Sequence, residues 1–409
     1  MIHGILCQGT LGNGRKTAVL VEGIVPSRTA RDAFARVREA LASPVPAIAA
    51  LVLLQAHAVT APWSLFALVA LALPCAWRGD GASRSRIGAI ETGAFAIAGA
   101  FIVAALASGA LSRALPVAVP LAGFVVVVLL AAQARAGDAA RIVDLLAIVA
   151  TVQLVQALAA LGGAGTPATA LQQASVPWLV VPNDLAWMAC LWPWWIARAR
   201  ARSGIARHAL VALLLLQLAT FVLFGSRLAL AVAAIATLAS LLPMRFTARR
   251  ALVGAGVIAF AGAAMLALGK GLASLGARVD LWRAAWSLFR EHPLLGVGPQ
   301  GFVQHYAAWL PAAPVDPRLT PWPHSLPLEV LAEWGALGAL AVAFAVFACW
   351  RAARSRNNPA FALAPVALAF TLAACVEASA LRLWLWALAA LLLAWPRIDI
   401  EHRTGDAPQ

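Results

Sequence analysis

Charged residues are scarce in this chain of 409 residues: only 12% are Asp, Glu, Lys or Arg, whereas a soluble globular domain carries about 25%. Apolar residues make up 62% of the sequence, above the roughly 45–50% that is usual for soluble proteins. This composition excludes a soluble enzyme and a disordered scaffold. Apolar stretches close to the ~20 residues that a membrane-spanning helix needs recur along most of the chain. The sequence therefore predicts an all-α polytopic membrane protein.

Cysteine is also rare. Four of the five cysteines, Cys75, Cys190, Cys349 and Cys375, lie in apolar segments, and Cys7 lies near the N-terminus. Neither a disulfide framework nor a cysteine metal site is therefore expected. The net charge of +14 is first a topology signal in a membrane protein, so nucleic-acid binding is not expected either. No apolar run of the signal-peptide type closely follows the first methionine.

Twelve apolar segments are candidate membrane spans. We expect a cytoplasmic N-terminal tail over 1–40, a transmembrane domain over 41–396 and a cytoplasmic C-terminal tail over 397–409. One long, partly helical periplasmic loop is expected over 270–325. The candidate spans are 41–58, 62–77, 87–107, 114–132, 142–162, 178–197, 208–225, 228–243, 251–269, 326–350, 359–377 and 380–396.

The distribution of basic residues predicts the orientation of these spans. With both termini in the cytoplasm, the inner segments hold 23 of the 31 Lys and Arg residues and the outer segments hold 8, which follows the positive-inside rule. The apolar run 208–243 is divided at Gly225-Ser226-Arg227, because an arginine at the bilayer centre would cost roughly 2.5–3.5 kcal/mol. The division places Arg227 at the outer surface of the membrane.

The long loop begins with a predicted amphipathic helix. Trp282, Trp286 and Phe289 share one helical face, and Arg283 lies on the opposite side. Arg278 falls on the aromatic face, where an arginine needs an anionic partner from the chain or from a ligand. The glycine-rich segment that follows, 293–298, lacks the strand and helix of a nucleotide-binding fingerprint. We interpret this segment as a turn that folds the loop back onto the membrane, and call it the glycine-rich turn.

Two further sites carry polar residues at the predicted outer ends of spans. His324 lies just before a span, with Ser325 as a plausible N-cap. Glu329 and Glu333 lie four residues apart on one face of that span, and acids within a span are functional candidates. In the sixth span, Asn183 and Asp184 fit hydrogen bonding between helices and ligand contact equally well.

Arg227, Arg278 and His324 all map to the outer surface, and together they suggest an enzyme. Two arginines suit a diphosphate, because their planar forks pair with phosphate oxygens. A histidine suits proton removal from a hydroxyl near neutral pH. No cluster of Asp and His suggests a metal, so the arginines would stabilise the leaving-group charge.

The order and spacing of these motifs resemble the O-antigen ligase/polymerase superfamily over residues 170–345. The motifs are Pro-Asn-Asp-Leu-Ala at 182–186, Gly-Ser-Arg at 225–227, Arg278 followed by Trp282, Pro-Leu-Leu-Gly-Val-Gly at 293–298, and His-Ser-Leu-Pro-Leu-Glu-Val-Leu-Ala-Glu-Trp-Gly at 324–335. Within this superfamily the chain is most similar to the O-antigen ligases. The fold implied by the resemblance is a GT-C-type glycosyltransferase architecture.

The resemblance implies a metal-independent glycosyltransferase of the bacterial inner membrane, without a cofactor and with a periplasmic active site. The donor would be a glycan on undecaprenyl diphosphate, and the acceptor a sugar hydroxyl of the lipid A–core oligosaccharide. Arg227 and Arg278 would bind the diphosphate, and His324 would act as a base on the acceptor. Further substrate contacts are expected at Asn183, Asp184, Trp282, Glu329 and Glu333.

Three alternatives remain open at this point. O-antigen polymerases use the same type of donor and carry Arg-X10-Gly motifs in two basic loops. Arg290 and Gly301 have that spacing here, but the second loop, 163–177, has no charge. Protein O-oligosaccharyltransferases share the histidine motif but usually have a longer outer C-terminal region. A secondary transporter would be built from inverted repeats, and the sequence shows none.

Overall fold

The computed structural model describes residues 5–8, 18–21, 88–131, 134, 137–163, 166, 169–171, 179, 181–241, 272–309, 322–354, 363–376 and 380–398. The chain divides into two compact units, Met1–Ser43 and Pro44–Gln409. In the first unit, β1 (Ile5–Gln8) pairs antiparallel with β2 (Ala18–Val21). These strands depart from the all-α prediction, whereas the cytoplasmic tail over 1–40 stays a prediction. Both are rich in apolar and β-branched residues, which favour strands.

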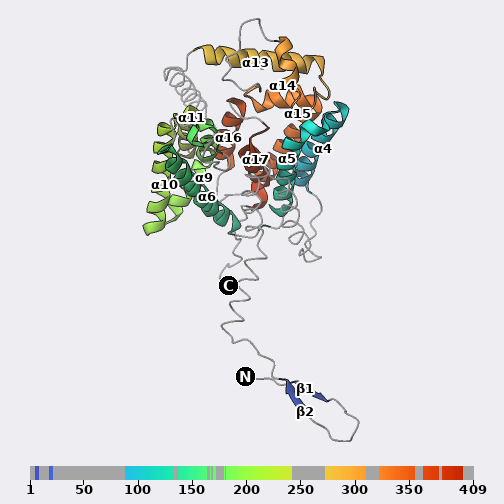
Figure 1. The fold of residues 1–409 in the computed structure, drawn as a ribbon. Coiled ribbons are helices and arrows are strands. Elements are labelled where there is room, and N and C mark those ends of the chain that lie inside the picture. Colours follow the sequence, from blue (N-terminus) through green and yellow to red (C-terminus); the bar gives the residue numbers. More distant parts are fainter. Residues whose placement is uncertain are drawn as a thin grey trace. The chain divides into compact units, whose positions relative to one another are not determined.

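The described elements of the second unit are all helices (Figure 1). In chain order they are α4 (Ala89–Ala107), α5 (Leu111–Ala131), α6 (Asp138–Leu161), the 3₁₀ helix η1 (Pro182–Leu185), α8 (Ala186–Cys190), α9 (Trp192–Ala201), α10 (Gly204–Leu223), α11 (Arg227–Leu241), α13 (Leu272–Glu291), α14 (Phe302–His305), the 3₁₀ helix η2 (Tyr306–Trp309), α15 (Leu326–Arg354), α16 (Leu363–Val376) and α17 (Leu383–Ile398).

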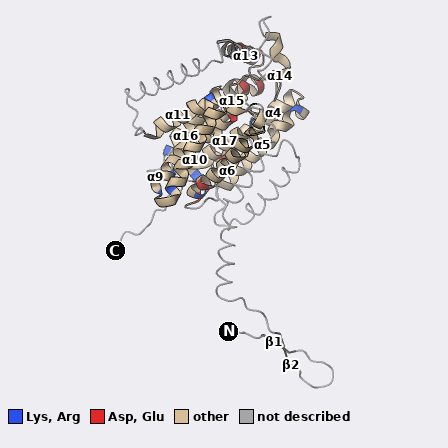
Figure 2. Ribbon diagram, turned by 60° about the vertical axis from the view of Figure 1, so that its left-hand side comes forward, with Lys and Arg blue, Asp and Glu red and all other residues tan. Residues whose placement is uncertain are grey.

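Five of the described helices, α4, α5, α6, α10 and α15, are long and apolar enough to cross a membrane. Figure 2 shows that uncharged residues cover most of the length of the helices in this unit. The chain is therefore a multi-pass membrane protein, as its composition predicts. The predicted spans 41–58, 62–77 and 251–269 lie outside the described residues, so the total of twelve stays a prediction.

Small residues allow close packing between the membrane helices. α4 packs along α15, and α5 packs along α17. A Cβ atom on Gly93 of α4 would lie 2.9 Å from the Cβ atom of Ala345 on α15, so this contact needs a glycine. Further along the same pair, the rings of Phe101 and Trp334 meet edge to face with their centroids 5.4 Å apart. Packing of this kind is typical of membrane helices, which lack a hydrophobic driving force between them.

The predicted break at Gly225-Ser226-Arg227 is confirmed. α10 ends at Leu223 and α11 begins at Arg227. Gly225 has a φ of 63°, in the left-handed region that glycine adopts without steric cost. The Ser226 N–H donates to the Phe221 carbonyl at 2.8 Å, which closes the end of α10.

A second break interrupts α15 at Gly335, where φ is 64° and ψ is −160°. This backbone conformation is essentially limited to glycine. In a continuous helix, each following N–H would donate to the carbonyl four residues earlier. Instead, the Ala336 N–H donates to the Pro293 carbonyl at 2.8 Å, and the Leu337 N–H donates to the Leu294 carbonyl at 3.1 Å.

The helix carbonyls released by this break are also satisfied by the glycine-rich turn. Ala332 accepts from the Val297 N–H, and Glu333 accepts from the Gly298 N–H, both at 2.9 Å. A Cβ atom on Gly296 would collide with the backbone of Glu333, so only glycine permits this approach. The interpretation of 293–298 as a turn is confirmed. The structure adds that the turn inserts into the helix break, so that the backbone groups at the break have partners.

Candidate active site

The helix predicted at the start of the long loop is present as α13, but its packed face is not the predicted one. α13 packs onto the protein through four small or aliphatic side chains, Leu281, Ala284, Ala285 and Leu288. Trp286 is 48% exposed and lies against Phe289 with ring centroids 5.3 Å apart, while Trp282 is half-buried. The helical face that carries Trp282, Trp286 and Phe289 is therefore not the face through which α13 packs. Alanines allow α13 to approach α15 closely, whereas large aromatic residues commonly lie at the membrane interface.

Arg278 and Arg283 lie on different sides of α13, as their helical positions predict. Arg278 is half-buried, and its guanidinium donates to the carbonyl of Val376, the last residue of α16, at 3.2 Å. Arg283 has a side chain that is 75% exposed and forms a local ion pair with Asp280 at 3.2 Å. Arg278 therefore faces the helical unit, and Arg283 faces away from it.

His324 lies two residues before the start of α15 and is 3% exposed. Its φ of 50° is in the left-handed region, which a residue other than glycine adopts only when its surroundings hold it there. The indole N–H of Trp322 donates to Nδ1 of His324 at 3.1 Å. Because the indole nitrogen can only donate, Nδ1 is the acceptor, and the neutral ring carries its proton on Nε2.

This bond changes the chemistry that His324 offers. The expected base role needs an unprotonated ring nitrogen that faces the substrate. In the structure the unprotonated nitrogen, Nδ1, is occupied by Trp322. The neutral ring held in this way carries its N–H at Nε2.

Trp322 is held in turn by Arg382, a residue that the sequence motifs did not single out. The guanidinium carbon of Arg382 lies 5.2 Å from the centroid of the Trp322 ring, within the range of a cation–π interaction. Arg382 also forms an ion pair with Asp184 at 3.0 Å, and the two side chains are only 12% and 3% exposed. The Asp184 carboxylate accepts further hydrogen bonds from the Trp384 indole at 3.0 Å and the Val181 N–H at 2.9 Å.

The two acids of α15 bind backbone groups of neighbouring segments. Glu329 accepts a hydrogen bond from the Ala380 N–H at 3.1 Å. Glu333 accepts from the Gln300 N–H at 2.8 Å and from the Phe302 N–H at 3.3 Å. Glu329 therefore anchors the segment before α17, and Glu333 anchors the segment before α14. These contacts give both acids a structural role at the site, whatever they contribute to binding.

The remaining predicted residues lie on elements that meet one another. Arg227 is half-buried at the first position of α11, and Asn183 is half-buried in η1. α11 packs against both η1 and α16. Arg278 is bonded to the end of α16, and α16 also packs against α15 and α17. The structure thus links His324 to Arg382 and Asp184 through Trp322. It also bonds Arg278 to the end of α16, the helix against which α11, the helix of Arg227, packs.

Residues 210–343 match the model of a protein family described as O-antigen ligase. This segment belongs to the O-antigen ligase/polymerase superfamily. The family implies an enzyme that acts on lipid-linked glycans. The O-antigen ligase segment contains Arg227, Arg278 and His324, whereas Asp184 and Arg382 lie outside it on either side. A comparison with curated proteins gives no match.

Arg382 lies outside the O-antigen ligase segment, but a signal for it was present in the sequence. It is a charged residue between the apolar stretches that became α16 and α17. A buried arginine needs an acidic partner, and Asp184 is an acid within another apolar span. Among the described residues, no group of three His, Cys, Asp or Glu side chains is arranged to hold a metal ion.

Proposed function

We propose that this protein transfers a polymeric O-antigen glycan from undecaprenyl diphosphate to a sugar hydroxyl of the lipid A–core oligosaccharide. The observation that carries the proposal is the position of Arg278 and His324, both inside the O-antigen ligase segment. Arg278 is turned toward the helical unit, and His324 is fixed in a buried, left-handed conformation at the start of α15. The basic residues favour cytoplasmic termini, which supports the proposal that this site lies at the periplasmic face of the inner membrane.

The donor diphosphate is the ligand proposed for Arg227 and Arg278. A guanidinium pairs with phosphate oxygens through two parallel N–H donors and keeps its charge at any physiological pH. The two residues come from different helices, α11 and α13, so they can hold the diphosphate from two sides. Their charges would stabilise the leaving diphosphate without a metal ion or a cofactor.

The reaction is a substitution at the anomeric carbon of the donor glycan. The acceptor hydroxyl oxygen forms a bond to this carbon, while the bond from the carbon to the diphosphate oxygen breaks. The electron pair of the broken bond stays on the diphosphate, and the hydroxyl proton passes to the diphosphate or to water. His324 donates its Nε2–H to the negative charge that develops on the diphosphate, which is the role that the bond from Trp322 favours.

Asp184 and Arg382 are proposed to position this histidine. The ion pair holds Arg382 against the Trp322 ring, and Trp322 fixes the His324 ring through Nδ1. Glu329 and Glu333 keep the neighbouring segments in place through backbone N–H groups. Asn183 and Trp282, which are half-buried, are proposed to contact the glycan or the lipid.

A strain in which the gene is deleted tests the ligase function against the polymerase function. A ligase is supported if polymer disappears from the lipid A–core and accumulates on the lipid carrier. A core that carries a single repeat unit in place of polymer would instead identify a polymerase. Reconstitution of the purified protein with both lipid substrates should then restore polymer on the core in one step.

A further inference from the structure

A pocket of about 530 Å³ lies beside the glycine-rich turn, and neither His324 nor Arg278 lines it. Its wall is formed by the end of α4, the start of α5, the turn itself and α14. The pocket falls within the ~300–1,000 Å³ range of small-molecule sites. None of the residues assigned to the reaction lines it.

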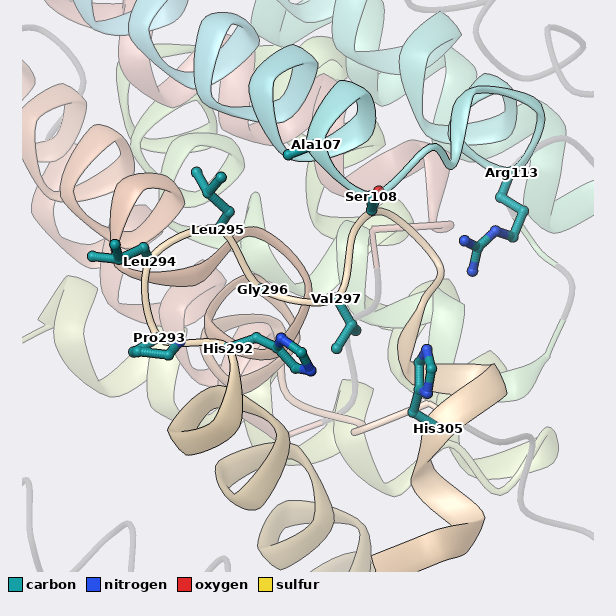
Figure 3. A pocket seen from close by; sticks show the side chains of 10 residues that line it. All are labelled: Ala107, Ser108, Arg113, His292, Pro293, Leu294, Leu295, Gly296, Val297 and His305. Carbon is teal, nitrogen blue, oxygen red and sulfur yellow. The ribbon is translucent and has the colours of Figure 1, made fainter.

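The side chains around this pocket are basic. Figure 3 shows the Arg113 guanidinium and the His292 and His305 rings around the same opening, with Ser108 nearby. Among the described residues that line the pocket, none is acidic. Three nitrogen donors from three elements match the several acceptor oxygens of a phosphate group. Leu295 and Val297 add apolar surface beside them.

Arg113 is held in place by hydrogen bonds to uncharged side chains. Its guanidinium donates to the side-chain oxygen of Gln304 at 2.6 Å, and its carbonyl accepts from the side-chain amide of Gln300 at 2.8 Å. Both partners are uncharged, and in the described parts of the chain no carboxylate forms an ion pair with Arg113. The guanidinium is therefore fixed in position by uncharged groups, and Glu333 interacts with it only through space, without an ion pair.

The walls of the pocket are rigid and close to the proposed active site. The turn is fixed to α15 through Ala332 and Glu333, and a Cβ atom on Gly298 would collide with Ser108. These two α15 residues are seven and eight positions after Ser325, the residue next to His324, so about 11 Å of helix separates the turn from Ser325. One oligosaccharide can span that distance.

We propose that this pocket binds a phosphate group carried by the acceptor saccharide, an inference that rests on the proposed function for the identity of the saccharide. Arg113 and the two histidines take the phosphate, and the apolar wall contacts the sugar ring. The pocket thereby selects phosphorylated acceptors and directs a neighbouring hydroxyl toward the anomeric carbon of the donor glycan.

Titration calorimetry on the purified full-length protein tests the pocket with three probes: glucose 6-phosphate, glucose and inorganic phosphate. Glucose 6-phosphate should bind at least about tenfold more tightly than either of the others. Arg113→Gln should weaken its binding about tenfold or more, since a charged hydrogen bond is lost. His305→Ala, at an exposed position, should weaken it by several-fold, whereas Arg283→Gln, on α13 and outside the pocket, should bind as the unmodified protein does.

Equal binding of glucose and glucose 6-phosphate, or unchanged binding by Arg113→Gln and His305→Ala, would overturn the proposal. Inorganic phosphate that binds as tightly as glucose 6-phosphate would overturn the saccharide assignment and identify a site for free phosphate. In a transfer assay, Arg113→Gln should raise KM for a phosphorylated acceptor and leave kcat and the KM for a dephosphorylated acceptor unchanged. If the unmodified protein transfers nothing, the proposed function fails, while the titration still decides the pocket.

Discussion

The bond from Trp322 to His324 makes a prediction that separates a donor role of the histidine from a base role. Trp322→Phe keeps an aromatic ring beside Arg382 but removes the N–H that holds Nδ1 at 3.1 Å. A neutral hydrogen bond contributes about 0.5–1.5 kcal/mol, and tenfold in rate corresponds to about 1.4 kcal/mol. We therefore expect kcat to fall about two- to tenfold. If His324 were a base, the same substitution would free Nδ1 to carry the proton, and kcat would be unchanged or higher.

Substitutions of the histidine itself complete this test. His324→Gln places an amide N–H close to the Nε2 position, whereas His324→Ala removes the donor and should reduce kcat about 10²–10³-fold. Single-turnover transfer by purified variants with matched donor binding is the assay, and the exposed Trp286→Phe is the control. The donor role is refuted if His324→Gln is as inactive as His324→Ala, or if Trp322→Phe reacts as fast as the unmodified enzyme.

Four other outcomes are expected. Arg278→Lys should not restore the donor affinity that Arg278→Ala loses, because an ammonium lacks the planar fork, while the exposed, paired Arg283→Ala should bind donor normally. Gly335→Ala should lower the free energy of unfolding by about 1–3 kcal/mol, seen as a lower thermal unfolding temperature. Gly99→Ala, at an open position in α4, should be neutral or stabilising. Transfer should persist in a metal chelator; a loss that added metal restores would contradict this. In a cysteine-free background, Ser203→Cys should resist an impermeant thiol reagent in intact cells, and rapid labelling would reverse the orientation.

The features that the sequence predicted well are those governed by local composition. The run 208–243 had to break at Arg227, because a membrane span excludes an arginine from its centre, and α10 and α11 meet there. The helical period of the loop predicted α13, and the glycines of 293–298 predicted a turn. In each case the deciding residues are neighbours in the chain, so no knowledge of distant contacts was needed.

The packed face of α13 shows where local patterns were insufficient. Large aromatic residues dominated the apolar pattern of this helix, yet the buried stripe contains Ala284 and Ala285. Alanine contributes little to an apolar pattern but allows two helices to approach closely. The partner of α13 is α15, and the break in α15 at Gly335 exists only because the glycine-rich turn supplies its hydrogen bonds. Neither segment predicts the other from its own sequence.

The same reasoning explains why the histidine motif alone did not fix the chemistry of His324. The ring is oriented by Trp322, two residues away, but Trp322 is held by Arg382, and Arg382 is held by an acid 198 residues earlier in the chain. Motif comparison finds the histidine, since it lies within the O-antigen ligase segment. The proton on the ring is assigned by Trp322, within the segment, and Trp322 is held by Arg382 and Asp184, which lie on either side of it. A homologue that keeps the histidine motif but lacks the Asp184–Arg382 pair should therefore hold its histidine ring in a different way. Differences between ligases and polymerases are best sought at the residues that orient this ring.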